Sequence, residues 1–526
     1  MKSSKKCSLI ILLGLLLIII AACGSDSSTE GDADDEASEE LNSELNIALN
    51  APPPTLDQPT STAVATRDVS RLIFEGLVAT DTSYNPVPML AESIDTDDNK
   101  TFIFKLRENI YFHNGKEMIA EDVVASMERW VEKSGVTGNI FNNATWTSED
   151  DYTVKLELVK ASSLTLDTMA SNTQAAAVMP KEIIESATEE GVEEYIGTGP
   201  FKFEKWEQDQ YIHLKKNDDY KSLDIKADGL SGQKEALVSD IYFHIVTDST
   251  TRLTGLQSGE YDVAYGIPYD NLEHIESDPD LEPLVMPAET LFLGFNKVEG
   301  IASDFKIREA INMALDKKDV ILSAFPNEDL IWMDSGYMDQ KIENWSSSSG
   351  KEYYNQNNPE KAKELLEEAG YDGEEFRILA TRDYDDVYNT AIVIQEQLAQ
   401  IGMNAKVDIY DWPTLVDLRE NDFEAWDAFT TGNSPVSTPP QLITLSSSWA
   451  GGVNDDYVEE TMEAIEFAPN IEEAQELWDE LQLYAWEELL PVVHFGGFDY
   501  LFGASNKVEG ITENSGPIFW NVKVID

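Results

Sequence analysis

The chain has 526 residues, and its 42% hydrophobic and 10% aromatic residues are enough to build more than one packed interior, which excludes a wholly disordered protein. It carries 99 Asp and Glu against 37 Lys and Arg, a formal net charge of −62, which makes nucleic acid a poor partner because a polyanion would be repelled. Both cysteines, Cys7 and Cys23, precede the folded part, so that part has no disulfide framework, zinc-thiolate cluster or cysteine nucleophile.

Residues 1–22 are predicted to be a lipoprotein signal peptide. Three lysines precede an apolar stretch, residues 9–22, which is short for a membrane-spanning helix but suits the core of a signal peptide. The segment Ile20-Ala21-Ala22-Cys23 resembles the lipobox of bacterial lipoproteins, whose cysteine is lipidated. We therefore expect Cys23 to anchor the protein at the outer face of the cell membrane. The alternative, an uncleaved membrane anchor, also places the bulk of the protein outside the cytoplasm.

Residues 23–44 are predicted to be an acidic disordered tether. This segment has nine acidic residues, no basic ones and too few apolar side chains to offset the entropy of ordering it. The acidic excess continues along the whole chain, which favours a solvated surface exposed to high salt or high pH over a dedicated site for cationic ligands.

Strands and helices alternate from Leu45 onward. Residues 101–106 and 152–158 alternate between apolar and polar side chains, which predicts half-buried antiparallel strands. Between them, apolar residues in 120–130 recur at helical spacing. Residues 81–195 are therefore predicted to be a compact α+β unit.

A different organisation begins near residue 291. Helical spacing predicts one helix over 307–315 and another that starts at Asn358-Pro359 and stops at Gly370. A strand at 376–380, a helix stopped by Gly402 and a strand at 403–410 have the lengths of a βαβ unit, which predicts a parallel or mixed sheet covered by helices. One more amphipathic helix is expected at 471–485.

The sequence contains little that indicates catalysis. The five histidines do not have the close spacing of a metal-binding helix pair, and there is no HExxH, GxSxG, P-loop or dinucleotide motif. With 99 acidic residues, paired carboxylates are inevitable and indicate nothing about glycoside hydrolysis. No catalytic residue, metal site or cofactor is predicted.

A set of collinear segments resembles one family over most of the chain. FIFKLRENIYFHNGKEMIAEDVVASMERW (102–130), GTGPFKFEKW (197–206), IREAINMALDKKDVI (307–321) and LPVVHF (490–495) are similar, in order, to the family 5 extracellular solute-binding proteins. These are the oligopeptide, dipeptide and nickel-type substrate-binding components of ABC importers. The signature residues themselves are predicted to have a structural role. His113-Asn114-Gly115 is predicted to form a turn, and Gly197 to Pro200 a turn that enters a strand.

The resemblance implies an α/β, periplasmic-binding-protein-like fold, with two α/β lobes joined by hinge strands and a smaller α+β extra domain. It assigns the regions as follows: lobe I to 45–80, 196–287 and 494–526, the extra domain to 81–195, and lobe II to 288–493. It implies a monomer that closes its lobes on a peptide or peptide-like solute and delivers it, chemically unchanged, to an ABC permease.

Other functions stay open from the sequence. Within the family the ligand is alternatively a metal chelate, nickel above all, or an oligosaccharide. Binding of a nickel complex would require a histidine in the cleft, and His494 is the only histidine expected near the cleft. From other classes, a secreted acidic hydrolase and a purely structural or adhesive lipoprotein remain alternatives. The sequence does not name the ligand, its length or the cognate permease.

The resemblance also nominates ligand-binding residues. In peptide-binding relatives, the loop that corresponds to residues 428–442 supplies an Asp that pairs with the peptide α-ammonium; here the matching positions read Gly432, Asn433 and Ser434. This departure removes the usual charge partner of a peptide amine, although Asn433 can still accept a hydrogen bond. Ser61 and Thr62 are expected beside the ligand.

Aromatic residues supply the remaining candidates. Trp332 is expected in a loop near the cleft, and Asp334 in the same loop is a possible replacement for the missing anion. Trp412, at a helix start, and Trp426, next to the cleft loop, are as compatible with core packing as with ligand contact.

Overall fold

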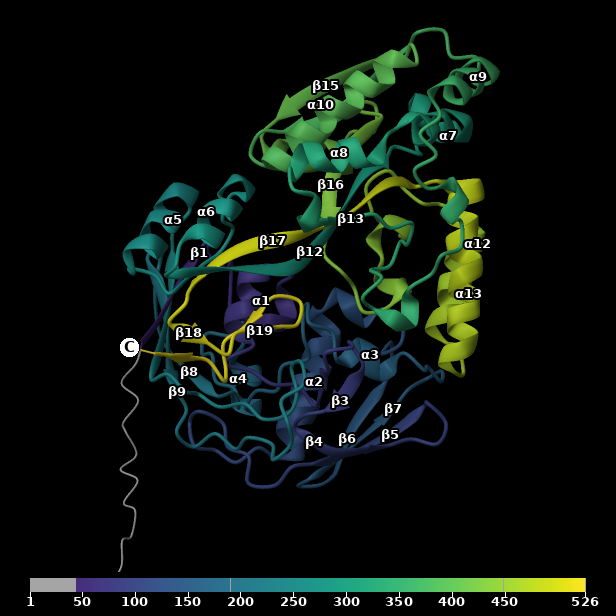
Figure 1. Cartoon of the computed structure of the whole chain (residues 1–526). Coiled ribbons are helices and arrows are strands. Elements are labelled where there is room, and N and C mark those ends of the chain that lie inside the picture. Colours follow the sequence, from purple (N-terminus) through teal and green to yellow (C-terminus); the bar gives the residue numbers. More distant parts are fainter. Residues whose placement is uncertain (1–43, 190, 448, 526) are drawn as a thin grey trace, which may run out of the picture. The chain divides into compact units, whose positions relative to one another are not determined.

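The structure, a computed structural model, describes residues 44–189, 191–447 and 449–525. The predicted signal peptide, the lipidated Cys23 and all but the last residue of the predicted tether lie outside the described residues. Figure 1 shows the described chain from its purple N-terminal strand to its yellow C-terminal segment. In this part of the chain, no helix is both long enough and apolar enough to cross a bilayer.

The largest sheet in the described residues is mixed and has eleven strands. Its order is β15-β14-β16-β12-β17-β11-β1-β10-β9-β8, and β13 pairs separately with β17. The strands are β15 (Asn404–Tyr410), β14 (Glu375–Thr381), β16 (Ala428–Asn433), β12 (Leu281–Phe295), β17 (Val492–Ser505), β11 (Val263–Ala264), β1 (Glu44–Leu49), β10 (Asp240–Ile245), β9 (Tyr211–Lys216), β8 (Phe201–Glu207) and β13 (Ile331–Trp332). β14 is parallel to β15 and β16, β1 is parallel to β10 and β11, and the central β12–β17 pair is antiparallel.

The predicted βαβ unit is confirmed. β14 and β15 are parallel neighbours connected by α10 (Asp385–Gln400), whose residues Ala391, Ile394 and Leu398 are fully buried. A helix that joins two parallel strands packs back over one face of their sheet. On β15 itself Ile409 is 43% exposed, because this strand forms the edge of the sheet.

The predicted helices are confirmed, and their ends follow local signals. In α9 (Pro359–Ala369) the Asn358 side chain accepts the Lys361 amide at 3.1 Å, and Gly370 takes the left-handed conformation (φ 75°) that ends the helix. The other α-helices of the described residues are α1 (Val64–Ser70), α2 (Ala120–Lys133), α3 (Thr165–Met169), α4 (Lys181–Ser186), α5 (Ser249–Ser258), α6 (Leu272–Ser277), α7 (Phe305–Ala314), α8 (Lys317–Ala324), α11 (Trp412–Asn421), α12 (Asp456–Glu466) and α13 (Ile471–Tyr484).

A smaller antiparallel sheet packs with α2. Its order is β4-β5-β7-β6, with strands β4 (Ala91–Asp95), β5 (Thr101–Leu106), β7 (Thr153–Glu157) and β6 (Thr145–Asp150). Trp130 of α2 meets Phe141 edge to face at 5.0 Å, and Phe104 lies 6.0 Å from Trp146, so aromatic rings form much of this core. Short strand pairs elsewhere are β2 (Val78–Thr80) with β3 (Pro86–Pro88), β18 (Val508–Glu509) with β21 (Lys523–Val524), and β19 (Thr512–Glu513) with β20 (Pro517–Ile518).

The long strands β12 and β17 connect the two halves of the large sheet (Figure 1). The two lobe crossings expected from the sequence, after residues 287 and 493, fall inside these strands, while the division into lobes stays a prediction. Their pairing has a register shift between Pro287 and Glu289. Such an irregularity bends a strand and redirects its side chains.

The signature residues that read as scaffold in the sequence do act as scaffold. The His113 ring lies with Nε2 3.0 Å from the Gly199 carbonyl oxygen, and the Gly197 amide donates to Nδ1 at 3.3 Å. A Cβ on Gly197 would lie 2.1 Å from the carbonyl oxygen of Ile73, so this close approach of two backbones requires glycine.

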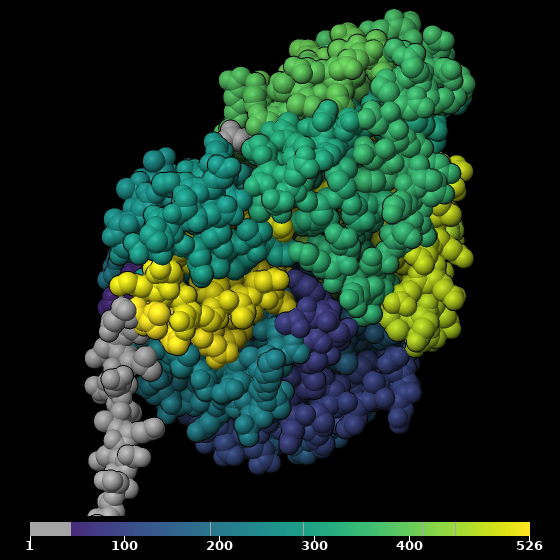
Figure 2. Space-filling view, viewed as in Figure 1, coloured from purple at the N-terminus to yellow at the C-terminus, as the bar shows by residue number. Residues whose placement is uncertain are grey.

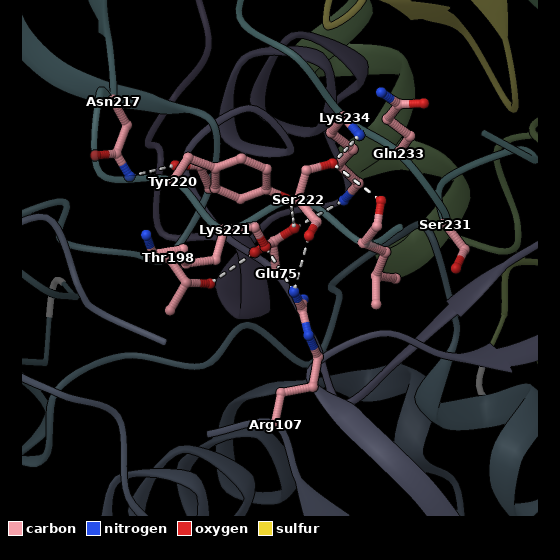
Figure 3. A network of polar contacts seen from close by, with 12 residues as sticks. Glu75, Arg107, Thr198, Asn217, Tyr220, Lys221, Ser222, Ser231, Gln233 and Lys234 are labelled. Atoms are coloured by element: carbon pink, nitrogen blue, oxygen red, sulfur yellow. Dashed lines mark hydrogen bonds and ion pairs between the residues drawn. The ribbon is translucent and has the colours of Figure 1, made fainter. Parts of the chain in front are cut away.

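A buried polar network joins segments far apart in the sequence (Figure 3). The Glu75 carboxylate accepts hydrogen bonds from the hydroxyls of Tyr220 (2.8 Å) and Thr198 (3.0 Å) and lies 3.0 Å from Lys234 Nζ. That Nζ also lies 4.6 Å from the centre of the Trp520 ring. Both members of the ion pair are buried and the carboxylate has several donors, the arrangement that makes a buried charge tolerable.

Candidate functional site

A cavity of about 620 Å³ lies among side chains from widely separated segments. Its walls come from the start of α1, the turn at 135–140, residues 168–174, β12, residues 339–342, the segment after β16, β17 and residues 515–516. Figure 2 shows purple N-terminal, yellow C-terminal and green central residues meeting on one face of the molecule. The volume lies within the roughly 300–1,000 Å³ of small-molecule sites. A second cavity, of about 60 Å³ beside Glu75, is too small for such a solute.

Four of the residues predicted to bind ligand line this cavity together: Thr62, Gly432, Asn433 and Ser434. Gly432 and Asn433 end β16, where they pair with Leu291 and Thr290 of β12, and Ser434 is the exposed residue that follows.

The Ser61 side chain is instead used within its own segment. Its hydroxyl donates to Thr66 at 3.2 Å and accepts the Ala63 amide at 3.1 Å, which fixes the entry to α1. Ser61 is not among the residues that line the cavity, whereas its neighbour Thr62 is.

Trp332 and Asp334 are not among the residues that line the cavity. The Trp332 ring packs directly over Gly497, and Lys341, which does line the cavity, places its Nζ 5.2 Å from the centre of that ring. The Asp334 carboxylate accepts the Gly336 amide at 3.1 Å, so it shapes its own turn rather than facing the cavity.

Trp412 and Trp426 pack in a small core away from the cavity. Trp426 is fully buried with Leu415 and Phe429, and Trp412 meets Tyr384 edge to face at 5.1 Å. The core-packing interpretation therefore describes Trp426, whereas Trp412 is half-buried and packs against this cluster.

The charged residues that line the cavity were not found from the sequence. They are the acids Glu289, Asp339 and Glu466 and the bases Arg67 and Lys341. Glu289 reaches the cavity wall through the register of β12 against β16 and β17. Local sequence patterns do not predict such a register.

The three acids have different partners. The Glu466 carboxylate accepts the backbone amide (2.6 Å) and the side-chain amide (3.0 Å) of Asn139, and Asp339 accepts the Lys341 amide at 2.8 Å. Glu289 accepts the Ser434 hydroxyl at 3.1 Å. Burial raises the pKa of all three carboxyl groups, and the hydrogen bonds lower it in part.

The described residues offer no evident metal centre. No group of three or more His, Cys, Asp or Glu side chains among them is arranged to hold a metal ion. His494 does not line the cavity: it is packed edge to face against Tyr337 at 4.6 Å, and burial lowers its pKa to about 3.

Comparison with known proteins identifies the same family as the sequence resemblance. The model of the bacterial extracellular solute-binding proteins, family 5 Middle, matches residues 85–456. The probable peptide ABC transporter periplasmic-binding protein y4tO of Sinorhizobium fredii is 26% identical over 492 residues, covering 89% of this chain and 91% of the relative. The oligopeptide-binding protein AppA of Bacillus subtilis is 26% identical over 466 residues, covering 83% and 82% respectively.

A solved structure extends the similarity to the fold. The PBP AgaA from A. tumefacien R10, in complex with agropinic acid, aligns with a TM-score of 0.73 at 27% identity, covering 92% of this chain and 99% of that one. The predicted fold class is therefore confirmed.

Proposed function

The chain belongs to the bacterial extracellular solute-binding proteins of family 5, and on that premise we propose that it captures a short peptide or peptide-like solute in the 620 Å³ cavity and delivers it to an ABC permease. The cavity is the observation that carries the proposal. Its walls come from all three regions expected from the sequence, so a solute inside it would be released when those regions part. A closed form of this kind is what a permease would recognise.

The peptide assignment is supported by the relatives and by the polar character of the cavity wall. Two curated relatives are named for peptides or oligopeptides. The wall combines hydroxyl, amide and carboxylate groups with apolar side chains, which suits a ligand with a polar backbone. We propose that Asn433, Ser434, Gly432 and Thr62 contact the ligand. Trp332 acts indirectly by supporting Lys341.

The remaining parts of the proposal concern the cell surface. We propose that Cys23 carries a lipid, that the acidic segment after it is a tether, and that the protein works as a monomer on the outer face of the membrane. Members of the family are solute-binding proteins that act outside the cytoplasm. We propose that this one, too, releases its ligand chemically unchanged.

The test uses the full-length protein and synthetic peptides of two to five residues. We expect some of these peptides to raise the melting temperature, because a ligand that binds only the folded state stabilises it by about 3 kcal/mol at a hundredfold excess over Kd. Mass spectrometry should recover the same peptides intact. Cleaved products would favour a hydrolase. No shift with peptides but a shift with a nickel-histidine complex or an oligosaccharide would move the ligand to another class.

A further inference from the structure

A carboxylate from the central strand pair faces the cavity beside the end of β16. Glu289 follows the register shift in β12, and the next residue, Thr290, pairs with Asn433. Its Oε2 atom lies 2.6 Å from the point that a Cβ on Gly432 would occupy. Glycine at position 432 therefore leaves the space in which this carboxylate sits.

The groups that surround the Glu289 carboxylate within hydrogen-bonding reach are neutral. Ser434 donates its hydroxyl at 3.1 Å, and Tyr500 lies close enough to favour the charged form as well. Burial acts in the opposite direction and raises the pKa of the carboxyl, and the negative charge of Asp386 raises it further. The carboxylate is thus half-buried on the cavity wall, and its hydrogen-bond donors among the described residues are hydroxyl groups.

The two cations of the cavity wall form ion pairs with acids other than Glu289. Arg67 Nε donates to Asp68 at 2.8 Å, and Lys341 Nζ lies 4.0 Å from Asp499. Among the described residues, none of the recorded ion pairs includes Glu289, and Arg67 offsets only the smallest part of its pKa shift. A positive charge that entered the cavity would therefore find a carboxylate that has no ion-pair partner among the described residues and is only weakly offset by Arg67.

We propose that Glu289 binds a protonated primary amine of the ligand, with Ser434 orienting the carboxylate and Gly432 making room for it. The inference rests on the proposed function, because it takes this cavity as the site of a peptide. An ammonium group supplies three N–H donors, and its hydrogen bonds to a carboxylate belong to the stronger class in proteins. Glu289 would then select ligands by charge and not only by shape.

The first experiment compares a tryptic digest of casein, used untreated, with the same digest after acetylation of every primary amine. Each is mixed with the full-length protein, and bound peptides are measured by native mass spectrometry. We expect about tenfold or greater loss of occupancy on acetylation in the wild type, and no such difference in Glu289→Gln. The matched control is Glu282→Gln, an exposed position on the same strand, which should behave as the wild type.

The outcomes separate the two proposals. Equal binding of both digests by the wild type would overturn the role of Glu289 and leave peptide capture standing. Binding of neither digest would overturn peptide capture, and with it this inference. A wild-type preference for the untreated digest that Glu289→Gln retains in full would show that another residue binds the amine.

A second measurement needs no ligand. Replacing a half-buried carboxylate that has no ion-pair partner among the described residues by a neutral amide should raise the melting temperature of the ligand-free protein by about 1–2 °C, while Glu282→Gln leaves it unchanged. A lower melting temperature for Glu289→Gln would overturn the inference, because it would mean that the carboxylate is already stabilised within the protein.

Discussion

Glu75 is buried and Glu289 is half-buried on a cavity wall, and their partners differ in one decisive respect. Glu75 has a lysine, a phenol and a hydroxyl as partners, with Lys234 Nζ 3.0 Å away. Glu289 has hydroxyl groups only, on the wall of a cavity. The first carboxylate is neutralised inside the molecule and belongs to the scaffold, whereas the second is arranged to be neutralised by something that arrives. Burial of an acid thus says little about its role until its cation is identified.

The largest expected effect comes from removing the cation that makes Glu75 a scaffold residue. Lys234→Met should lower the free energy of unfolding by about 3–5 kcal/mol, because it leaves a buried carboxylate without a charge partner. Urea denaturation followed by circular dichroism measures the change. In this variant Glu75, like Glu289, would have hydroxyl donors but no lysine or arginine as an ion-pair partner.

The double variant Glu75→Gln with Lys234→Met serves as its control. It removes both charges and should recover most of the lost stability, since an uncharged pair carries no desolvation penalty. Lys226→Met, an exposed lysine in the same region, should change stability by less than about 0.5 kcal/mol. A double variant as unstable as Lys234→Met alone would mean that Glu75 is held by its hydroxyl partners and not by the lysine.

The next effect concerns the space beside Glu289. In Gly432→Ala the new Cβ would lie 2.6 Å from Glu289 Oε2, so the carboxylate must move away from its position. We expect affinity for an amine-bearing peptide to fall by about tenfold or more, equivalent to about 1.4 kcal/mol, with the fold intact. Isothermal titration calorimetry measures it.

A double-mutant cycle shows whether Gly432→Ala acts through the carboxylate. In a Glu289→Gln background the same substitution should cost much less affinity, because the charged contact is already gone. Equal losses in both backgrounds would indicate that the methyl group blocks the ligand directly. In that case the experiment would give no support for a role of the Glu289 carboxylate in ligand binding.

Much of the fold could be predicted because its signals are local. The cap at Asn358, the stop at Gly370 and the helical spacing of α10 each lie within one turn or one helix, and all three appear in the structure as expected. The pairing of β12 with β17 joins residues about two hundred positions apart. Nothing in either strand alone specifies that partner or its register, since both depend on the packing of the whole sheet.

The site was predictable only where a resemblance pointed to it. Thr62 and Gly432 to Ser434 line the cavity, but two of the aromatic candidates do not: Trp426 lies in a core and Trp412 packs against it. Glu289 was hidden for a physical reason. It is one acid among 99 Asp and Glu, and its special property is that it forms no ion pair with any described residue, which a sequence does not display.

The pH dependence of stability should separate Glu289 from its replacement. Burial and the charge of Asp386 raise the pKa of Glu289 above its ordinary 4.5, so the folded ligand-free protein holds this proton more tightly than the unfolded chain. Its contribution to stability is therefore lost as pH rises from 4.5 through the raised pKa. The advantage of Glu289→Gln over the wild type should therefore grow as pH rises from 5 to 7.5.

The other groups that face Glu289 are Ser434, Tyr500 and Arg67, and they are present in both proteins. The raised pKa values of Asp339 and Glu466 likewise contribute equally to both, so the difference isolates one carboxyl. Urea denaturation at each pH provides the measurement. A constant difference across the range would mean that the pKa of Glu289 is the same folded and unfolded, contrary to the expected lack of compensation.

The smallest effect tests what one hydroxyl does at each glutamate. Ser434→Ala removes the donor 3.1 Å from Glu289, but Ser434 is exposed to the cavity and water can replace it, so affinity for an amine-bearing peptide should fall only two- to fivefold, about 0.5–1 kcal/mol. Thr198→Val removes the corresponding donor from Glu75 at a buried position that water does not reach, so there the loss should appear in unfolding free energy, at about 1–2 kcal/mol. The two substitutions delete the same chemical group from the same kind of carboxylate. Loss of a hydroxyl at a ligand site changes affinity, whereas loss of a structural hydroxyl changes stability. If both substitutions changed stability and neither changed binding, Glu289 would be a structural residue like Glu75.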